Sequence, residues 1–189
     1  MLGKIERITL SGLAGSGKSA VGKILAKKLR FEFISIGEFT RKFAMEKYGL
    51  GIDAFQALCE KDKSIDMQID KDFQKECNSK EKIVADCRLG FHFFKENAFH
   101  ILLKVSDAVA IQRIQNADRK EEEATAENIG VRNERMIKRA VEIYGIDFTE
   151  DNNYNFVIDT DPHTPEEISR KIISCLEEQK FDLNNEQKV

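Results

Sequence analysis

Short apolar runs alternate with amphipathic segments along the chain. Between the runs, apolar residues recur at spacings of three and four, as Val21, Ile24, Leu25 and Leu29 do, which predicts helices that bury one face. This alternation favours an α/β domain in which helices cover both faces of a parallel sheet. The runs rich in β-branched and aromatic residues predict strands at 5–11, 31–36, 82–87, 98–105 and 154–159.

Two stretches depart from strict alternation. A helix-rich stretch runs from Gly37 to about Ser79 and is broken at Gly49-Leu50-Gly51. Residues 118–130 are highly charged and carry few apolar positions, as expected of a lid exposed to solvent, and a helix is expected again from about Val131 to Tyr144. We therefore expect one domain over 1–189, with a helical part at about 36–80, a lid at about 115–140 and a flexible tail at 181–189.

The start of the last helix is marked by its capping residues. Thr164-Pro165-Glu166-Glu167 combines the spacing of a capping box with a proline at the first helical position. Ile168, Ile172, Cys175 and Leu176 then form a stripe that we expect to be buried.

Composition and charge narrow the class of protein. The chain has 189 residues with 30 basic and 33 acidic side chains, a net charge of −3, which argues against a domain that coats nucleic acid. No apolar run approaches the roughly 18 residues of a membrane helix. Four widely spaced cysteines indicate free thiols in a reducing compartment. We expect a cytoplasmic monomer with neither a membrane nor a nucleic acid polymer as partner.

A glycine-rich loop follows the first predicted strand. Residues 12–19 read GLAGSGKS, which satisfies the pattern GxxxxGK[ST] and opens a helix, as a phosphate-binding loop must. Its backbone N–H groups can cradle phosphates in conformations that glycine adopts cheaply, and Lys18 would reach the β- and γ-phosphates. The Ser19 hydroxyl would bind Mg²⁺. The predicted ATP-binding residues are Gly12, Leu13, Ala14, Gly15, Ser16, Gly17, Lys18, Ser19 and Ala20.

A carboxylate ends the third predicted strand. Asp86 follows the apolar run Ile83-Val84-Ala85. Because the carboxyl ends of parallel strands meet at one edge, we expect Asp86 to face the loop and to hold Mg²⁺ together with Ser19. The alternative is an aspartate that only caps a turn.

Three arginines recur on one predicted helix. Arg132, Arg135 and Arg139 are spaced i, i+3, i+7, so their guanidinium groups can gather on one face and stabilise a phosphoryl group in transfer. Met136, Ala140, Val141 and Tyr144 fall on a different face, which we expect to pack. The alternative is a solvated basic stripe paired with Glu134 and Glu142.

Further charged residues follow other predicted strands. Arg41 and Arg88 stand where they could clamp an acceptor phosphate, although each could instead form a surface ion pair. Asp62, Asp66 and Asp70 share a helix face, and we interpret them as a solvated stripe. Cys87 is interpreted as a buried cysteine rather than a reactive thiol.

With these residues in place, the chain resembles the cytidylate kinases, closest to the short archaeal-type branch of the P-loop nucleoside monophosphate kinases. Two positions differ from the family pattern, since Cys87 replaces a common glycine and Ser35 replaces a bacterial aspartate, and the bacterial insert that helps to hold cytosine is absent. The landmarks are GLAGSGKS at 12–19, LAKKLRFEFISIGEFTR at 25–41, EKDKSIDMQID at 60–70, VADCR at 84–88, RNERMIKRAVEIYGID at 132–147 and FVIDT at 156–160.

The resemblance implies a fold and a reaction. It implies a three-layer α/β/α P-loop NTPase fold with a five-stranded parallel sheet, a helical monophosphate-binding part and an arginine-bearing lid. It also implies transfer of a phosphoryl group from ATP, with Mg²⁺, to CMP or dCMP. By position, Arg41 and Arg88 match acceptor-phosphate arginines, and Arg132, Arg135 and Arg139 match lid arginines.

Other functions stay open at this point. The loop alone fits a kinase of another acceptor, such as a different nucleotide, dephospho-coenzyme A or a metabolite. It also fits a nucleotide-binding module that is not an enzyme. An ATPase subunit that acts on nucleic acid is disfavoured by the net charge and the short chain.

Overall fold

The computed structural model describes residues 5–116 and 126–186, and the side chains of 5–116 and 129–178. Five strands form one sheet in the order β2-β3-β1-β4-β5, and every neighbouring pair is parallel. The strands are β1 (Arg7–Ser11), β2 (Glu32–Ser35), β3 (Ile83–Asp86), β4 (Ala98–Lys104) and β5 (Phe156–Asp159). All five predicted strands are confirmed, and with them the parallel α/β sheet.

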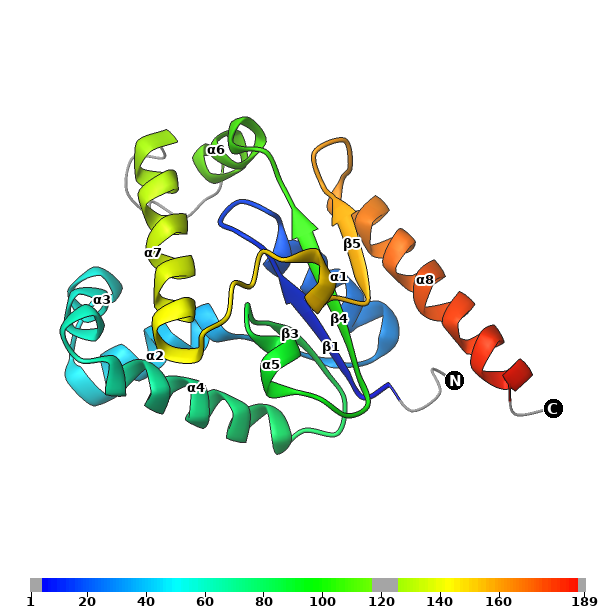
Figure 1. Cartoon of the computed structure of the whole chain (residues 1–189), viewed down its shortest axis with the longest axis horizontal. Helices are drawn as coiled ribbons and strands as arrows, with labels where there is room; N and C mark the ends of the chain where they lie inside the picture. Colours follow the sequence, from blue (N-terminus) through cyan, green and yellow to red (C-terminus); the bar gives the residue numbers. More distant parts are fainter. Residues whose placement is uncertain (1–4, 117–125, 187–189) are drawn as a thin grey trace.

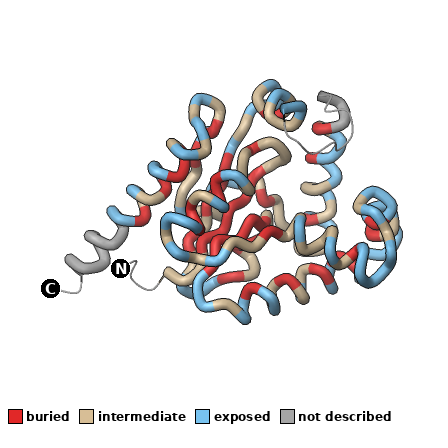
Figure 2. Tube along the Cα trace, turned by 180° about the vertical axis from the view of Figure 1, so that it is seen from behind, coloured by how far each residue is buried: buried red, intermediate tan, exposed pale blue. Residues whose placement is uncertain are grey.

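Helices cover both faces of the sheet (Figure 1). On one face, α1 (Lys18–Leu29) and α8 (Pro165–Glu186) pack on the apolar residues Ile8, Leu10 and Ile101. On the other face, α4 (Lys63–Asn78) contributes Phe73 and Cys77 to a second cluster against Ile83 and Ala85 of β3. The buried positions therefore follow the alternation of a strand covered on both sides, and Figure 2 shows them concentrated along the central strands.

The remaining helices lie between the strands in sequence. They are α2 (Ile36–Tyr48), α3 (Ile52–Lys61), α5 (Gly90–Phe93), α6 (Asp107–Gln115), α7 (Ala126–Tyr144) and the 3-10 turn η1 (Asp151–Asn153). In Figure 1, α7 stands beside α3 and over α2 and α4, at the carboxyl edge of the sheet.

The helix boundaries refine the prediction in three places. The predicted break at residues 49–51 is confirmed, but a second break lies at Asp62, whose side chain accepts a hydrogen bond from the Ser64 N–H at 2.9 Å and caps α4. The short helix α5 was not predicted. α7 already includes Ala126–Gly130, before the expected start near Val131, and the rest of the charged segment, residues 117–125, lies outside the described residues.

The capping box of the last helix is confirmed. Thr164 N–H donates to Glu167 Oε2 at 2.8 Å, and Thr164 Oγ1 accepts from the Glu167 N–H at 3.3 Å. The stripe packs as predicted, with Ile168, Ile172 and Leu176 fully buried. The helix continues to Glu186, into the segment expected to be a tail, and 187–189 lie outside the described part.

Candidate functional site

The glycine-rich loop connects the central strand to α1. At Gly12 the backbone has φ +143°, and a Cβ atom there would lie 2.3 Å from the Leu103 carbonyl oxygen, so only glycine fits. Lys18 Nζ donates to the carbonyl oxygens of Gly12 at 2.8 Å and Leu13 at 2.7 Å, and lies 3.2 Å from Ser16 Oγ. The lysine is thus held inside the curve of the loop, where a phosphate would meet it.

Two oxygen-bearing side chains meet beside this loop. The parallel register places Asp86 of β3 opposite Leu10 of β1, at the strand end from which the loop departs. Ser19 Oγ donates to Asp86 Oδ2 at 2.6 Å, and Ser35 Oγ donates to the same oxygen at 3.4 Å. The predicted proximity of Asp86 to the loop is therefore found, and the pair offers the hard oxygen ligands that Mg²⁺ prefers.

A concentration of positive charge lies at the same edge. Burial lowers the pKa of Lys18 to about 8; the negative charge of Asp86 opposes this shift, and Arg88 and Arg132 add to it. Arg88 is held by its backbone, because Ser11 Oγ donates to the Arg88 carbonyl oxygen at 2.6 Å. Burial also lowers the pKa of Arg88, and its buried Nε has no hydrogen-bond partner. These two half-buried cations favour an anionic ligand.

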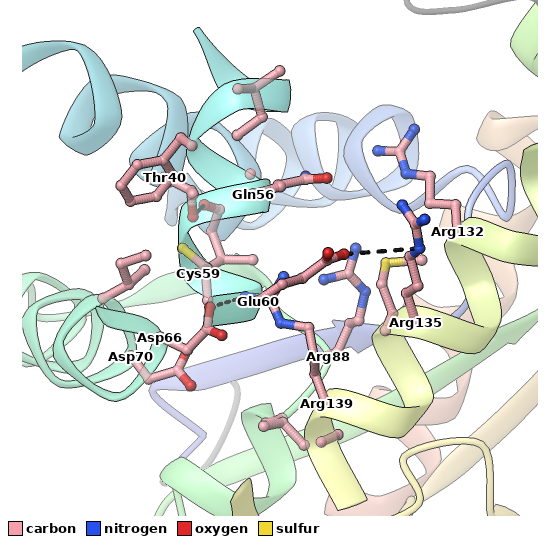
Figure 3. Close-up of a pocket in the computed structure, with 18 of the residues that line it drawn as sticks. Thr40, Gln56, Cys59, Glu60, Asp66, Asp70, Arg88, Arg132, Arg135 and Arg139 are labelled. Atoms are coloured by element: carbon pink, nitrogen blue, oxygen red, sulfur yellow. Dashed lines mark hydrogen bonds and ion pairs between the residues drawn. The ribbon is translucent and has the colours of Figure 1, made fainter. Parts of the chain in front are cut away.

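A cavity of about 680 Å³ adjoins these groups. Its lining comes from α2, α3, α4 and α7 and from the segment after β3, and it includes Arg41, Arg88 and all three arginines of α7. Figure 3 shows Arg88, Arg132, Arg135 and Arg139 around this space, together with the carboxylates of Glu60, Asp66 and Asp70. The structure therefore brings every predicted arginine to one cavity.

Two of the three arginines of α7 pair with carboxylates of other helices. Arg135 Nε lies 3.8 Å from Glu60 of α3, and Arg139 forms an ion pair with Asp66 of α4. Glu142, expected as a partner for them, instead pairs with Lys63 at 2.8 Å and Lys138 at 3.9 Å. Glu142 is therefore not the partner of Arg135 or Arg139, but Arg132 and Arg135 are exposed, as the alternative of a solvated basic stripe expected.

The interpretation of the acidic stripe on α4 is wrong. Asp66 is 9% exposed, and Asp70 accepts a hydrogen bond from the Tyr144 hydroxyl at 2.7 Å. Burial raises the pKa of Asp70 to about 6, against the opposing effects of Tyr144 and Arg88. Both carboxylates line the cavity, because α7 covers this face of α4, and only the capping residue Asp62 is exposed as expected.

The expectation for Cys87 is confirmed and the one for Val141 is wrong. Cys87 is 1% exposed and burial raises the pKa of its thiol well above the usual value, which confirms a buried, unreactive cysteine. Val141 was expected on the packed face of α7 but is 46% exposed. Met136, Ala140 and Tyr144 do pack, around the buried Phe148.

Comparisons with known proteins show the family of the chain. Residues 7–162 match the cytidylate kinase-like family. The chain belongs to the cytidylate kinase-like family. It is 37% identical to a cytidylate kinase from Methanosarcina barkeri over 82% of the chain and 87% of that protein, and 32% identical to one from Methanobrevibacter smithii over 89% and 97%.

Another relative has a different name. An S-adenosylmethionine-dependent nucleotide dehydratase from Lacinutrix mariniflava is 53% identical over 88% of this chain. The chain spans 35% of that protein's length. The chain is therefore similar to one part of a larger protein.

Solved structures support the fold of the cytidylate kinase-like chain. A gluconokinase from Sinorhizobium meliloti superposes with a TM-score of 0.62 at 16% identity, covering 96% of this chain and 97% of that one. A shikimate kinase from Aquifex aeolicus gives 0.56 at 18%, covering 93% and 98%. These neighbours establish the three-layer α/β/α P-loop architecture. No helix in the described ranges, 5–116 and 126–186, has the length and apolar character to cross a membrane.

Sequence reasoning missed two residues that hold the site of this cytidylate kinase-like chain together. Asn133 of α7 is 7% exposed, and its Oδ1 accepts from the Ala14 N–H of the loop at 3.1 Å. Arg113 of α6 donates to the Thr160 carbonyl oxygen at 2.6 Å and approaches the Gly15 carbonyl oxygen at 3.4 Å. The only signal in the sequence was a polar residue beside Arg132 and an arginine at the end of a helix.

Proposed function

We propose that this chain is a nucleoside monophosphate kinase that transfers the γ-phosphoryl group of MgATP to CMP or dCMP. The observation that carries the proposal is that a phosphate-binding loop and an arginine-lined cavity lie side by side. A glycine-rich loop with a half-buried lysine opens beside a cavity lined by arginines from α2, α7 and the segment after β3. Membership of the cytidylate kinase-like family supports a nucleotide as the acceptor.

The donor is expected to bind on the loop. Residues 12–20 would bind the phosphates of ATP through their backbone, with Lys18 beside the β- and γ-phosphates. Ser19 and Asp86 fit the Mg²⁺ that accompanies ATP, since their oxygens already lie 2.6 Å apart and Mg²⁺ usually takes one or two protein oxygens besides phosphate and water. The ion would neutralise phosphate charge.

The acceptor is expected to bind in the cavity. Arg88 and Arg41 would hold its phosphate so that one oxygen lies in line with the γ-phosphoryl group. Such an oxygen is already a nucleophile, so the transfer needs positioning and charge neutralisation rather than a strong general base. The buried Arg88 Nε without a partner supports this, because a phosphate oxygen would satisfy it.

The arginines of α7 would complete the site. Arg132 already contributes to the positive potential at Lys18. Arg135 and Arg139 are proposed to turn toward phosphate when α7 closes, which requires exchange of their pairs with Glu60 and Asp66. Closure over both substrates would exclude water and limit ATP hydrolysis.

A second candidate acceptor follows from the relative named as a nucleotide dehydratase. Because the identity to one part of that protein is 53%, the acceptor could be a nucleotide that has lost water. The same loop, metal ligands and arginines would serve, since the phosphate is unchanged. A kinase of another small acceptor and a nucleotide-binding module without turnover remain the wider alternatives.

We also propose a cellular compartment and an oligomeric state for the enzyme. Cys59, Cys77, Cys87 and Cys175 are all free, which is consistent with a reducing cytoplasm. We propose a monomer, to be tested by sedimentation.

The first experiment is a coupled assay for ADP formation with ATP, Mg²⁺ and a panel of CMP, dCMP, UMP, AMP and GMP. Turnover with CMP or dCMP alone supports the proposal. Turnover with another acceptor keeps the reaction and rejects the specificity. ATP binding without turnover on any acceptor, a dehydrated nucleotide and dephospho-coenzyme A included, rejects the kinase.

A further inference from the structure

The cavity has two chemically different sides. Lys18, Arg88 and Arg132 influence one another electrostatically at the loop side, where a phosphate would lie. The opposite side is formed by α3 and α4 and carries the carboxylate of Asp66, which Figure 3 shows. Carboxylates repel phosphate, so this second side is suited to the nucleoside part of an acceptor.

Asp66 is the least satisfied of these carboxylates. The residue is only 9% exposed, its Oδ1 pairs with Arg139, and its buried Oδ2 has no hydrogen-bond partner. A buried carboxylate oxygen without a donor is costly and uncommon among the described groups, where Arg88 Nε is the other case. Asp66 and Arg88 both line the cavity, and the unpartnered atom of each is buried just behind its lining. A ligand with an anion at one end and a hydrogen-bond donor at the other would satisfy both.

The walls between the two sides suit a flat ring. Ile52, Phe55 and Ile69 are among the residues that line the cavity, and Cys59 adds a thiol. Apolar walls with a few fixed polar groups are typical of sites that bind aromatic ligands. We therefore look for the donor on a heterocyclic base.

We propose that Asp66 is a specificity-determining residue, whose Oδ2 accepts a hydrogen bond from the exocyclic amino group of the acceptor base. An ionised carboxylate only accepts hydrogen bonds. Cytosine presents an amino donor at ring position 4, whereas uracil presents a carbonyl acceptor there, which Asp66 would repel. In the unliganded structure the other oxygen is bound to Arg139. The inference rests on the proposed nucleotide acceptor and explains how cytosine is read without the bacterial insert.

The test begins with the wild-type chain and needs no variant. Calorimetry compares CMP, UMP and the CMP analogue that lacks the 4-amino group, each with a non-hydrolysable ATP analogue present. We expect CMP to bind at least about tenfold more tightly than either of the others. Equal affinity for CMP and the desamino analogue overturns the assignment.

The variant Asp66→Asn then tests the residue itself. Its amide can donate as well as accept, so the ratio of CMP to UMP affinity should fall at least about tenfold, chiefly through a gain for UMP. Asp72→Asn is the matched control, since it makes the same change on α4 outside the cavity lining. An equal loss for CMP and UMP with Asp66→Asn assigns Asp66 to structure and overturns the inference.

Two further measurements distinguish a base contact from a sugar contact, and binding from turnover. If wild type prefers CMP to dCMP and Asp66→Asn removes that preference, Asp66 binds the sugar and the base assignment fails. If CMP binds with the expected discrimination but ADP never forms, the proposed reaction fails while the assignment of Asp66 stands. Should Asp66→Asn not fold, the comparison with the desamino analogue decides alone.

Discussion

At the scale of single residues, burial sets the charge that the site presents. Lys18 is positively charged in the free protein below about pH 8 and neutral above it, because burial lowers its pKa. Its pKa in an unfolded chain is near 10.5. Between these values the unfolded chain binds more protons, so this group makes the unliganded fold more stable as the pH rises from about 8 toward 10.5.

The binding of ATP should respond in the opposite direction. Phosphates favour the charged lysine, so above about pH 8 binding must take up a proton and the affinity should fall by up to about tenfold per pH unit. Calorimetry at pH 7 and pH 9, in buffers with different heats of ionisation, measures that uptake. ATP itself contributes little, because a terminal phosphate with a pKa of about 6 is already ionised.

Lys18→Ala provides the control for this prediction. It should abolish the proton uptake and lower turnover at pH 7 at least about hundredfold, while circular dichroism stays unchanged. A variant that retains near-normal turnover contradicts the role given to Lys18.

Arg88 should act on the acceptor rather than on ATP. Arg88→Ala is expected to raise the KM for CMP at least about thirtyfold and the KM for ATP less than about threefold, since a bidentate guanidinium clamp is lost from one substrate only. Initial rates with each substrate varied in turn give the comparison.

Arg88→Lys is the matched variant for that experiment. It keeps the charge but loses the fork, so its effect on CMP should be intermediate. Equal changes in both KM values argue against an acceptor clamp. Because Arg88 lies near Asp70 and Asp86, thermal unfolding of each variant must be measured beside its kinetics.

At the scale of elements, the helix α5 lies unusually close to the central strand. A Cβ atom at Gly90 would sit 2.4 Å from Thr9 Cβ. Thr9 cannot easily move, because it is fully buried and its Oγ1 lies 2.8 Å from His100 Nδ1.

We therefore expect Gly90→Ala to lower the free energy of unfolding by about 2 kcal/mol through overpacking. Urea denaturation measures the change. Gly130→Ala is the control, because Gly130 lies in α7 with no atom within 4 Å of an added Cβ, and it should be neutral or stabilising by up to about 1 kcal/mol. Similar unfolding free energies for the two variants rule out the close approach.

Elements with a strong local signal were predictable from the sequence. The five strands and the loop at 12–19 were found because their apolar runs and glycines act locally. Helix α5 was missed because four residues carry no period, and its position depends on Gly90 meeting Thr9. The break at Asp62 was missed because the charged run around it has no glycine or proline.

The acidic face of α4 shows where local reasoning failed. The sequence pattern of carboxylates at spacing i, i+4 is the same whether water or another helix covers them. What decides between these is α7, whose Tyr144 contacts Asp70 across 74 positions of sequence. Periodicity within one helix contains no information on that contact.

At the scale of the whole molecule, the strand order gathers the site from segments distant in sequence. β1 lies between β3 and β4, so the loop after β1, Asp86 at the end of β3 and the segment after β4 meet at one edge. The sequence allowed this meeting to be predicted for Asp86, because it follows from parallel strands alone. The pairings of Glu60 and Asp66 were not predictable, since they depend on how α7 packs over α3 and α4.

The position of α7 has a thermodynamic consequence for the two substrates. One helix contacts the loop through Asn133 and Ala14 and contacts α4 through Arg139 and Tyr144. Any shift of α7 that one ligand favours must then change the affinity for the other ligand. We expect a non-hydrolysable ATP analogue to tighten CMP binding about fivefold or more, and CMP to tighten binding of the analogue by the same factor.

Calorimetry in both orders measures this factor, and Asn133→Ala should reduce it toward one, with the affinity of each ligand alone less affected. If each ligand binds with the same affinity whether or not the other is present, α7 does not couple the two sites. If the factor is large, the single helix α7 couples the two binding equilibria. The enzyme then favours the ternary complex over a complex with only one of the two ligands.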